Sequence, residues 1–214
     1  MLADDGKNLE RSLAELVMEV SEASHPEIRS AIDERSGLSL IAQDGRINEI
    51  GLVTPDRLPK FFEAVKAQHD LVVIDGVRSF SDHAVTAMDC ADKILLVMTQ
   101  DIPAFRSARK VISLMKRLDY GRGKVQLIVN RHQKRGMLSI DEIEEYLDYP
   151  VTEVLPNDFK FASSLIEQGA LAHDVNLKHT VTVGYDRLAR RLLSLEVDRA
   201  KRSFFAQLFS SKRS

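Results

Sequence analysis

Apolar residues are arranged along the chain in two ways, as short continuous runs and as stripes with helical spacing. The runs predict strands over residues 37–42, 71–75, 93–98, 124–129 and 151–156. The stripes and capping signals predict helices over residues 9–20, 54–68, 81–90, 103–118, 139–147, 159–168 and 180–197. Because no β-hairpin signal separates the strands, the alternation predicts an α/β fold, a mostly parallel sheet with helices on both faces.

Polar residues end or follow most of the predicted strands. They are Asp75, Thr99–Asp101, Asn130–Arg131 and Pro156–Asp158. In open parallel sheets, ligands bind beyond the carboxyl ends of the strands, so these residues are candidates for a binding site. The alternative is that they are ordinary turn residues.

A strand that runs into an acid, as Leu71–Asp75 (LVVID) does, suggests a nucleotide-binding protein. A phosphate loop requires Gly-x-x-x-x-Gly-Lys-Ser/Thr after a strand, because its backbone N–H groups and its lysine surround the phosphates. The Gly-Lys pairs of this chain continue as Gly6–Asn8 and Gly123–Val125, and neither fits. A dinucleotide-binding Gly-x-Gly-x-x-Gly is absent as well.

Composition and charge narrow the class of protein. The chain has 214 residues with 29% charged residues and a net charge of −2, and it has no apolar run near the ~20 residues of a membrane-spanning helix. The single cysteine and the lack of a leader pattern in residues 1–10 predict a cytoplasmic protein. The body is acidic, which argues against a nucleic-acid partner. The spacing of the histidines argues against a zinc site.

The last residues differ from this acidic body. Residues 198–214 form a predicted tail that carries basic residues at both ends and four large apolar residues between them. These are Phe204, Phe205, Leu208 and Phe209, preceded by Lys201 and Arg202. On a helix the apolar residues share one side, which is typical of a helix that lies in a membrane surface or on a partner. The alternative is that the phenylalanines pack on the body.

Two further charged groups lie on predicted helices. Arg106 and Arg109 share one face, either as a solvated face or as a contact with a partner or a second copy. Asp141, Glu142, Glu144 and Glu145 lie at the start of another helix. There they complement the helix dipole, and we do not expect them to act in acid–base catalysis.

Two long stretches resemble a known family. HDLVVIDGVRSFSDHAVTAMDCADKILLVMTQDIPAFRSARKVISLMKRL and LIVNRHQKRGMLSIDEIEEYLDYPVTEVLPNDFKFASSLIEQGALA are similar to the CpaE/TadZ family, MinD/ParA-type ATPases of Flp (tight-adherence) pilus assembly. The resemblance covers residues 37–195. The run PAFRSARK and the pair NR and PND make it specific to this branch. It implies a MinD/ParA-like P-loop NTPase fold over residues 1–197, N-terminally incomplete because GKNLERSLAELVMEV matches the stretch after the family's second strand.

The resemblance also implies roles for individual residues. Asp75 matches the Walker B carboxylate that orders the water shell of Mg²⁺, and Asn130, followed by Arg131, matches the asparagine that reads the adenine edge. Pro156 and Asp158 match the segment that lines the base. ATP and Mg²⁺ are therefore the implied cofactors. Without a phosphate loop we expect weak nucleotide binding and no catalysis by this chain alone.

Two hypotheses follow. In the first, the chain is a CpaE/TadZ-like protein that helps to place or assemble a Flp pilus machine, works as a homodimer with pilus secretion components, and lies at the inner membrane or the cell pole through its tail. In the second, it is a non-catalytic localisation scaffold that has lost its nucleotide, or a MinD/ParA-type cell-positioning or partition protein.

Overall fold

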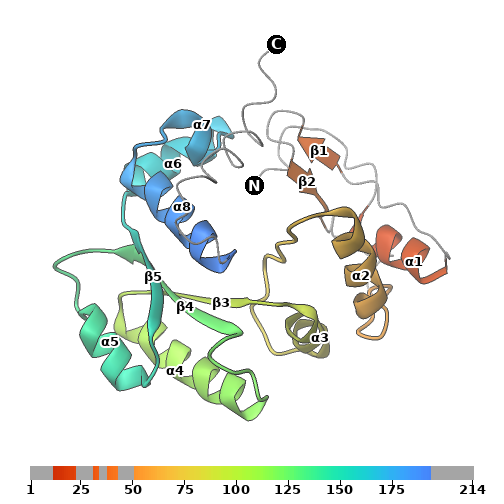
Figure 1. Cartoon of the computed structure of the whole chain (residues 1–214), viewed down its shortest axis with the longest axis horizontal. Helices are drawn as coiled ribbons and strands as arrows, with labels where there is room; N and C mark the ends of the chain where they lie inside the picture. Colours follow the sequence, from red (N-terminus) through yellow and green to blue (C-terminus); the bar gives the residue numbers. More distant parts are fainter. Residues whose placement is uncertain (1–11, 23–30, 34–37, 43–50, 194–214) are drawn as a thin grey trace. The chain divides into compact units, whose positions relative to one another are not determined.

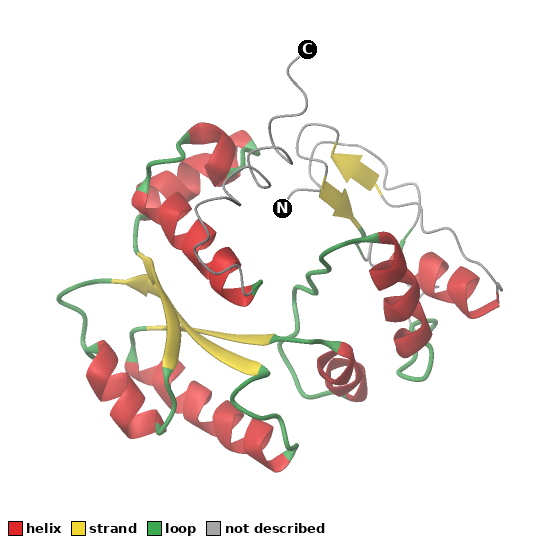
Figure 2. Cartoon of the chain, in the orientation of Figure 1, coloured by secondary structure: helices red, strands yellow, loops and turns green. Residues whose placement is uncertain are grey.

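The computed structural model describes residues 12–22, 31–33, 38–42 and 51–193. The chain divides into two compact units, Met1–Ala91 and Asp92–Ser214, which we describe separately. Their elements are labelled in Figure 1 and coloured by type in Figure 2. The predicted tail, residues 198–214, lies outside the described residues. None of the helices within the described ranges has the length and hydropathy that a membrane span requires.

The described part of the first unit contains three helices and a short antiparallel strand pair. Its elements are α1 (Leu13–Glu22), β1 (Ala31–Asp33), β2 (Leu38–Leu40), α2 (Leu58–Gln68) and α3 (Asp82–Cys90). The strand predicted over residues 37–42 is confirmed at Leu38–Leu40, but it pairs antiparallel with β1 and is not part of a parallel sheet. Its core forms where α1 packs on α2, through Leu16, Val17, Val20, Leu58, Phe61 and Val65.

Two helix starts in this unit follow from local chemistry. At α1, the Ser12 hydroxyl accepts from the Glu15 N–H and the Glu15 carboxylate accepts from the Ser12 N–H, which is a capping box. At α2, the predicted start at Thr54 is wrong, because residues 54–57 form a turn closed by the Arg57 N–H and the Thr54 carbonyl. Pro59 lies at the first positions of α2, where a missing N–H costs nothing.

The predicted strand over residues 71–75 does not form. Residues 71–78 are neither helix nor strand, and the side chains of Leu71 and Val73 are 61% and 78% exposed. A strand is stable only when its N–H and C=O groups pair with a neighbouring strand. No described segment pairs with these residues, so the apolar run alone does not produce a strand.

The second unit contains a parallel sheet in the order β3-β4-β5. Its elements are β3 (Ile94–Thr99), α4 (Ile102–Arg117), β4 (Val125–His132), α5 (Ile140–Leu147), β5 (Val151–Pro156), α6 (Phe159–Gln168), α7 (Ala172–Val175) and α8 (Thr180–Leu192). α4 and α5 lie on one face of the sheet and α8 on the other (Figure 1). This confirms the predicted α/β class, a parallel sheet with helices on both faces.

The core of this unit lies around the central strand. Leu127, Ile128 and Val129 of β4 are fully buried. The covering helix α4 contributes buried side chains spaced by helical turns, namely Ala108, Ile112 and Met115. Both faces of β4 are apolar because both are covered, which is the pattern of a central parallel strand. This packing fixes the carboxyl ends of β4 and β5, where the candidate site lies.

Candidate functional site

A pocket of about 360 Å³ opens where β4 and β5 end, against the start of α8. It is lined by His132, Val154, Pro156, Lys178, Thr180, Val183 and Arg187. Its place beyond the carboxyl ends of parallel strands is the usual place for a ligand in such sheets. His132 and Pro156 are paired in the sheet, so the two strand ends hold this wall rigidly.

The pocket carries more positive than negative charge. The described structure records no hydrogen bond or ion pair to the ammonium of Lys178, while Arg187 lies on α8 and makes its ion pair below the pocket. No acidic side chain is among the lining residues. The arrangement therefore suits an anionic or hydrogen-bond-accepting small molecule.

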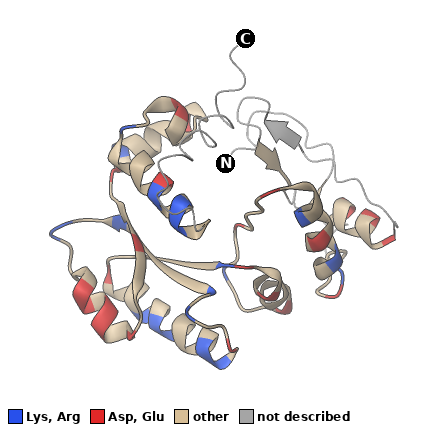
Figure 3. Cartoon of the chain, in the orientation of Figure 1, with Lys and Arg blue, Asp and Glu red and all other residues tan. Residues whose placement is uncertain are grey.

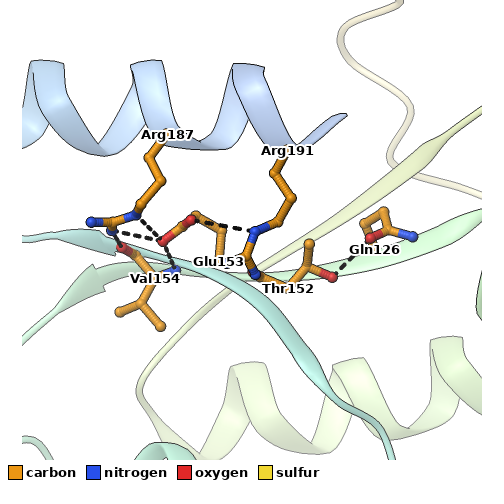
Figure 4. A network of polar contacts seen from close by, with 6 residues as sticks. All are labelled: Gln126, Thr152, Glu153, Val154, Arg187 and Arg191. Atoms are coloured by element: carbon orange, nitrogen blue, oxygen red, sulfur yellow. Dashed lines mark hydrogen bonds and ion pairs between the residues drawn. The ribbon is translucent and has the colours of Figure 1, made fainter. Parts of the chain in front are cut away.

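Beneath the pocket, a buried acid ties α8 to the sheet (Figure 4). Glu153 of β5 is only 6% exposed, and its Oε1 lies 2.7 Å from Nη2 of Arg187. Nε of Arg191 lies 3.9 Å from its Oε2. Arg187 also donates to the Val154 carbonyl and Arg191 to that of Thr152. These contacts fix the helix that forms one pocket wall.

The charge state of Glu153 follows from this environment. Burial by itself raises the pKa of Glu153, but the hydrogen bond from Arg187, the Val154 N–H and the charges of Arg187 and Arg191 outweigh it. The pKa of Glu153 therefore lies below its ordinary value. Oε2 has no hydrogen bond within the described structure, so the carboxylate depends on its arginine partners.

Asp158, which was predicted to line a base, has a structural role here. Its Oδ1 accepts from the Phe161 N–H as the N-cap of α6, and its Oδ2 lies 3.3 Å from Nε2 of His179. The His179 ring stacks on Phe161 at 3.6 Å, and its Nδ1 accepts from the Val181 N–H at the start of α8. Asp158 therefore joins the starts of α6 and α8, and it does not line the pocket.

The residues after β3 also act as turn and cap residues. The Asp101 carboxylate caps α4 through the Ala104 N–H. The hydrogen bond from the Thr99 hydroxyl and then that N–H hold the pKa of Asp101 below its ordinary value. Gln100 accepts from the Gln133 N–H and donates to the carbonyl of Leu138. Here the alternative of ordinary turn residues describes the structure better.

Asn130 and Arg131 form a bend in β4. Arg131 has φ +55°, a left-handed conformation that few non-glycine residues adopt, and the Asn130 Oδ1 accepts from its N–H. The pairing of β4 with β5 shifts between Val129 and His132 as a result. The Asn130 amide N–H₂ remains available, but Asn130 and Arg131 are not among the pocket lining.

Asp75, the expected Walker B carboxylate, belongs to the first unit. It is exposed, and its Oδ1 accepts from the N–H of Gly76, which has φ +87°. Asp75 therefore does not lie at the end of a strand, because residues 71–75 do not form one. Of the predicted site residues, only Pro156 lines the pocket.

Sequence reasoning missed the basic residues of the pocket and the buried acid. Some features of the sequence do indicate the buried acid and its arginine partners. Glu153 is an isolated acid within the apolar strand VTEVLP, which indicates a buried carboxylate that needs a partner. Arg187 and Arg191 are spaced by one helical turn, so they can reach the same acid.

The donors for a nucleotide and its metal are incomplete in the described chain. The full sequence holds no phosphate loop, and within the described residues no group of three or more metal-ligating side chains comes together. The residues present therefore do not fit Mg-ATP.

The chain is similar in sequence to MinD proteins, although no protein-family model matches it. It is 27% identical over 149 residues to the septum site-determining protein MinD of Bacillus subtilis, covering 68% of this chain and 55% of the relative. The MinD of Synechocystis is 28% identical over 145 residues, covering 65% and 53%. The chain thus spans about half the length of the curated relatives it matches.

Solved structures agree at the level of the fold. A ParA family ATPase from Chlorobium tepidum superposes with a TM-score of 0.71 at 18% identity, covering 84% of this chain and 75% of that one. The Pyrococcus furiosus cell division ATPase MinD gives 0.70 at 18% identity, covering 88% and 78%. A chain of the Aquifex aeolicus MinC:MinD cell division complex gives 0.69 at 21% identity, covering 88% and 75%. The chain therefore has the fold of the MinD and ParA ATPases and is a sequence relative of the MinD proteins.

Proposed function

We propose that this chain is a MinD/ParA-type positioning protein that works as a localisation scaffold without turning over ATP. The observation that carries the proposal is the match to MinD proteins over two thirds of the chain, in a sequence that holds no phosphate loop. Phosphoryl transfer depends on positive charge held against the phosphates, and the described residues offer none in a suitable loop. The described fold contains a parallel sheet with a pocket at its strand ends.

The placement of the scaffold rests on the tail sequence. The tail sequence has four large apolar residues at a spacing that would place them on one side of a helix, and basic residues flank them, which suits the surface of an anionic membrane. Each basic residue near such a surface contributes about 1 kcal/mol, and the attraction falls as salt screens it. We propose that residues 198–214 bring the chain to the inner face of the membrane, with Phe205 buried in the lipid and Lys201 and Arg202 at the headgroups.

Co-sedimentation with liposomes tests this placement. The chain is expected to sediment with anionic liposomes at low salt, less at high salt, and poorly with neutral ones. Phe205→Glu is expected to abolish sedimentation and leave the circular dichroism spectrum unchanged, while Ser210→Glu, which adds charge off the apolar side, retains most of it. A parent chain that ignores anionic liposomes overturns the membrane placement.

A turnover assay tests the scaffold role independently. Phosphate release from ATP by the chain is expected to equal a blank without protein. Release above the blank that is lost in Asp75→Ala would show that Asp75 acts as a catalytic carboxylate, and the scaffold proposal would then be wrong. Residual binding of adenine nucleotides, where it is measurable, is expected to weaken in Asn130→Ala.

A second candidate is the pilus role of the CpaE/TadZ type. The observation that favours it is the sequence run PAFRSARK, residues 103–110, together with the NR and PND strand ends. Deletion of the gene in the source organism distinguishes the two. Loss of Flp-type pili with normally placed septa supports the pilus role, and misplaced septa with intact pili support a MinD-like role.

A further inference from the structure

The helices α4 and α5 form a surface on which opposite charges are separated into two stripes. The two helices lie beside each other on one face of the sheet, and Figure 3 shows basic residues on α4 and acidic residues on α5. α4 carries five basic residues and no acidic one: Arg106, Arg109, Lys110, Lys116 and Arg117. All five are exposed.

Most of the cations on α4 are not used within the chain. Lys116 lies 3.5 Å from the Asp148 carboxylate. Arg106, Arg109, Lys110 and Arg117 make no hydrogen bond or ion pair with the described residues. Arg106, Lys110 and Arg117 are spaced by whole helical turns, so they form one outward stripe. This stripe is available to an external partner.

Some acidic side chains of α5 make hydrogen bonds with described residues and others do not. The Glu142 carboxylate accepts from the Ser139 N–H, and that of Glu144 accepts from the Val151 N–H. Asp141 and Glu145, one helical turn apart, are exposed and make no contact with described residues. With Asp148 just after the helix they form an outward acidic stripe parallel to the basic one.

An aromatic pair lies between the two stripes. The rings of Phe105 on α4 and Tyr146 on α5 meet edge to face with centroids 6.1 Å apart. Tyr146 is 65% exposed. An exposed tyrosine bordered by a basic and an acidic stripe resembles the centre and rim of a protein interface.

We propose that this surface binds the same surface of a second copy of the chain. α4 and α5 both connect parallel strands, so they run in the same direction along the sheet. A two-fold axis along the Phe105–Tyr146 seam brings the second copy face to face. This rotation places the basic stripe of each copy over the acidic stripe of the other, and Tyr146 meets its counterpart at the axis. An isologous contact of this kind is complementary to itself.

The charge pattern favours a second copy over other occupants. An anionic membrane or a wholly acidic partner would attract α4 but would be repelled by Asp141 and Glu145 beside it. A second copy satisfies both stripes at once. The face is about 24 Å long for a helix of 16 residues and about 20 Å wide for two helices. It covers less than the ~800 Å² per partner of a standard interface, so we expect a weak dimer that depends on salt.

Charge reversal on one side of the surface tests the proposal. One variant carries Arg106→Glu and Lys110→Glu, so that both of its stripes are negative. The other carries Asp141→Lys and Glu145→Lys, so that both are positive. A matched control, Arg78→Glu with Lys160→Glu, makes the same charge change at exposed positions outside α4 and α5. Self-association of the intact chains is measured without nucleotide by sedimentation velocity over a dilution series at low salt, with circular dichroism to confirm folding.

The expected pattern is specific to this geometry. Each reversed variant alone is expected to raise the dissociation constant by about ten-fold or more, because like charges face each other. An equimolar mixture of the two is expected to restore a 1:1 dimer, and the control is expected to behave as the parent. The proposal is wrong if the parent stays monomeric, if a reversed variant dimerises as the parent does, or if the mixture does not dimerise.

Discussion

The segment Leu71–Ile74 in the first unit and the strand β4 in the second contain similar runs of branched apolar residues, but their environments are opposite. Leu71 and Val73 are mostly exposed, whereas Leu127 and Val129 are fully buried. Only Val72 of the first run packs on the core of its unit. In β4, both neighbouring strands are present and helices cover both faces.

The difference shows that an apolar run forms a strand only where neighbouring strands pair with its backbone. β4 satisfies its backbone groups on two sides, since β3 and β5 pair with it along its length. Residues 71–74 have the same composition but no strand beside them among the described residues. The burial of a side chain, and therefore its contribution to stability, depends on this pairing.

The largest expected effect is in β4. Leu127→Ala removes a fully buried side chain from the sheet core and is expected to lower the free energy of unfolding by about 2–5 kcal/mol. Urea denaturation followed by circular dichroism measures the loss, and hydrogen exchange locates it in the second unit. A loss below about 1 kcal/mol would contradict the packing described for β4.

The next effect is in the ion pair that holds α8 to β5. Arg187→Ala leaves the buried Glu153 carboxylate with the Val154 N–H and the more distant Arg191. Removing one partner of a buried ion pair typically lowers the free energy of unfolding by about 3–5 kcal/mol. For Arg187→Ala we expect a smaller loss of about 2–3 kcal/mol, because the Arg187 side chain is 53% exposed. The matched control is Arg190→Ala on the same helix, which removes an exposed pair with Asp186 and is expected to cost less than about 1 kcal/mol. Equal losses in the two variants would show that Glu153 is not buried in solution.

The sequence predicts the second unit well and the first unit less well, for the same physical reason. The Ser139–Glu142 capping box, α4 and the strands β3 to β5 follow from local patterns, and the structure confirms them. The strand predicted over 71–75 does not form, and the one predicted over 37–42 forms as β2 but pairs antiparallel with β1. A sequence pattern indicates that a segment can form a strand, but it does not show which strand will pair with it.

The candidate site likewise contains residues that local sequence signals predict and residues that only tertiary packing brings together. Pro156 was predicted as a pocket residue because it ends a strand, a local signal. The lining residues Lys178, Thr180 and Arg187 come from α8 and the turn before it, and they reach the pocket only through tertiary packing. Asp158 was assigned to a base because of a resemblance, while its local sequence, an acid just before a helix, indicated the N-cap that the structure contains.

A smaller effect is expected from pH in the second unit. The pKa of Glu153 is lower in the folded chain than in the unfolded chain, where a glutamate titrates near pH 4.3. The unfolded state therefore binds the proton first as the pH falls. The stability from Glu153 is present above about pH 4.3 and is lost as the pH falls through the folded pKa. Urea midpoints between pH 6 and 3 should fall more steeply for the parent than for Glu153→Gln, and parallel curves would show that Glu153 is not the group responsible.

The smallest expected effect completes the comparison with β4. Val73→Ala removes two methyl groups from a side chain that is 78% exposed, so little apolar surface returns to water when the chain unfolds. We expect the free energy of unfolding to change by less than about 0.5 kcal/mol, the usual range for exposed positions. The matched position is Val129→Ala in β4, where the same methyl groups are fully buried and the loss is expected to be about 2 kcal/mol. Urea denaturation of both variants measures the two losses in the free energy of unfolding, which can then be compared. A loss of more than about 1 kcal/mol in Val73→Ala would show that residues 71–74 are covered in solution, and the difference between the two regions would then lie in their partners rather than in exposure.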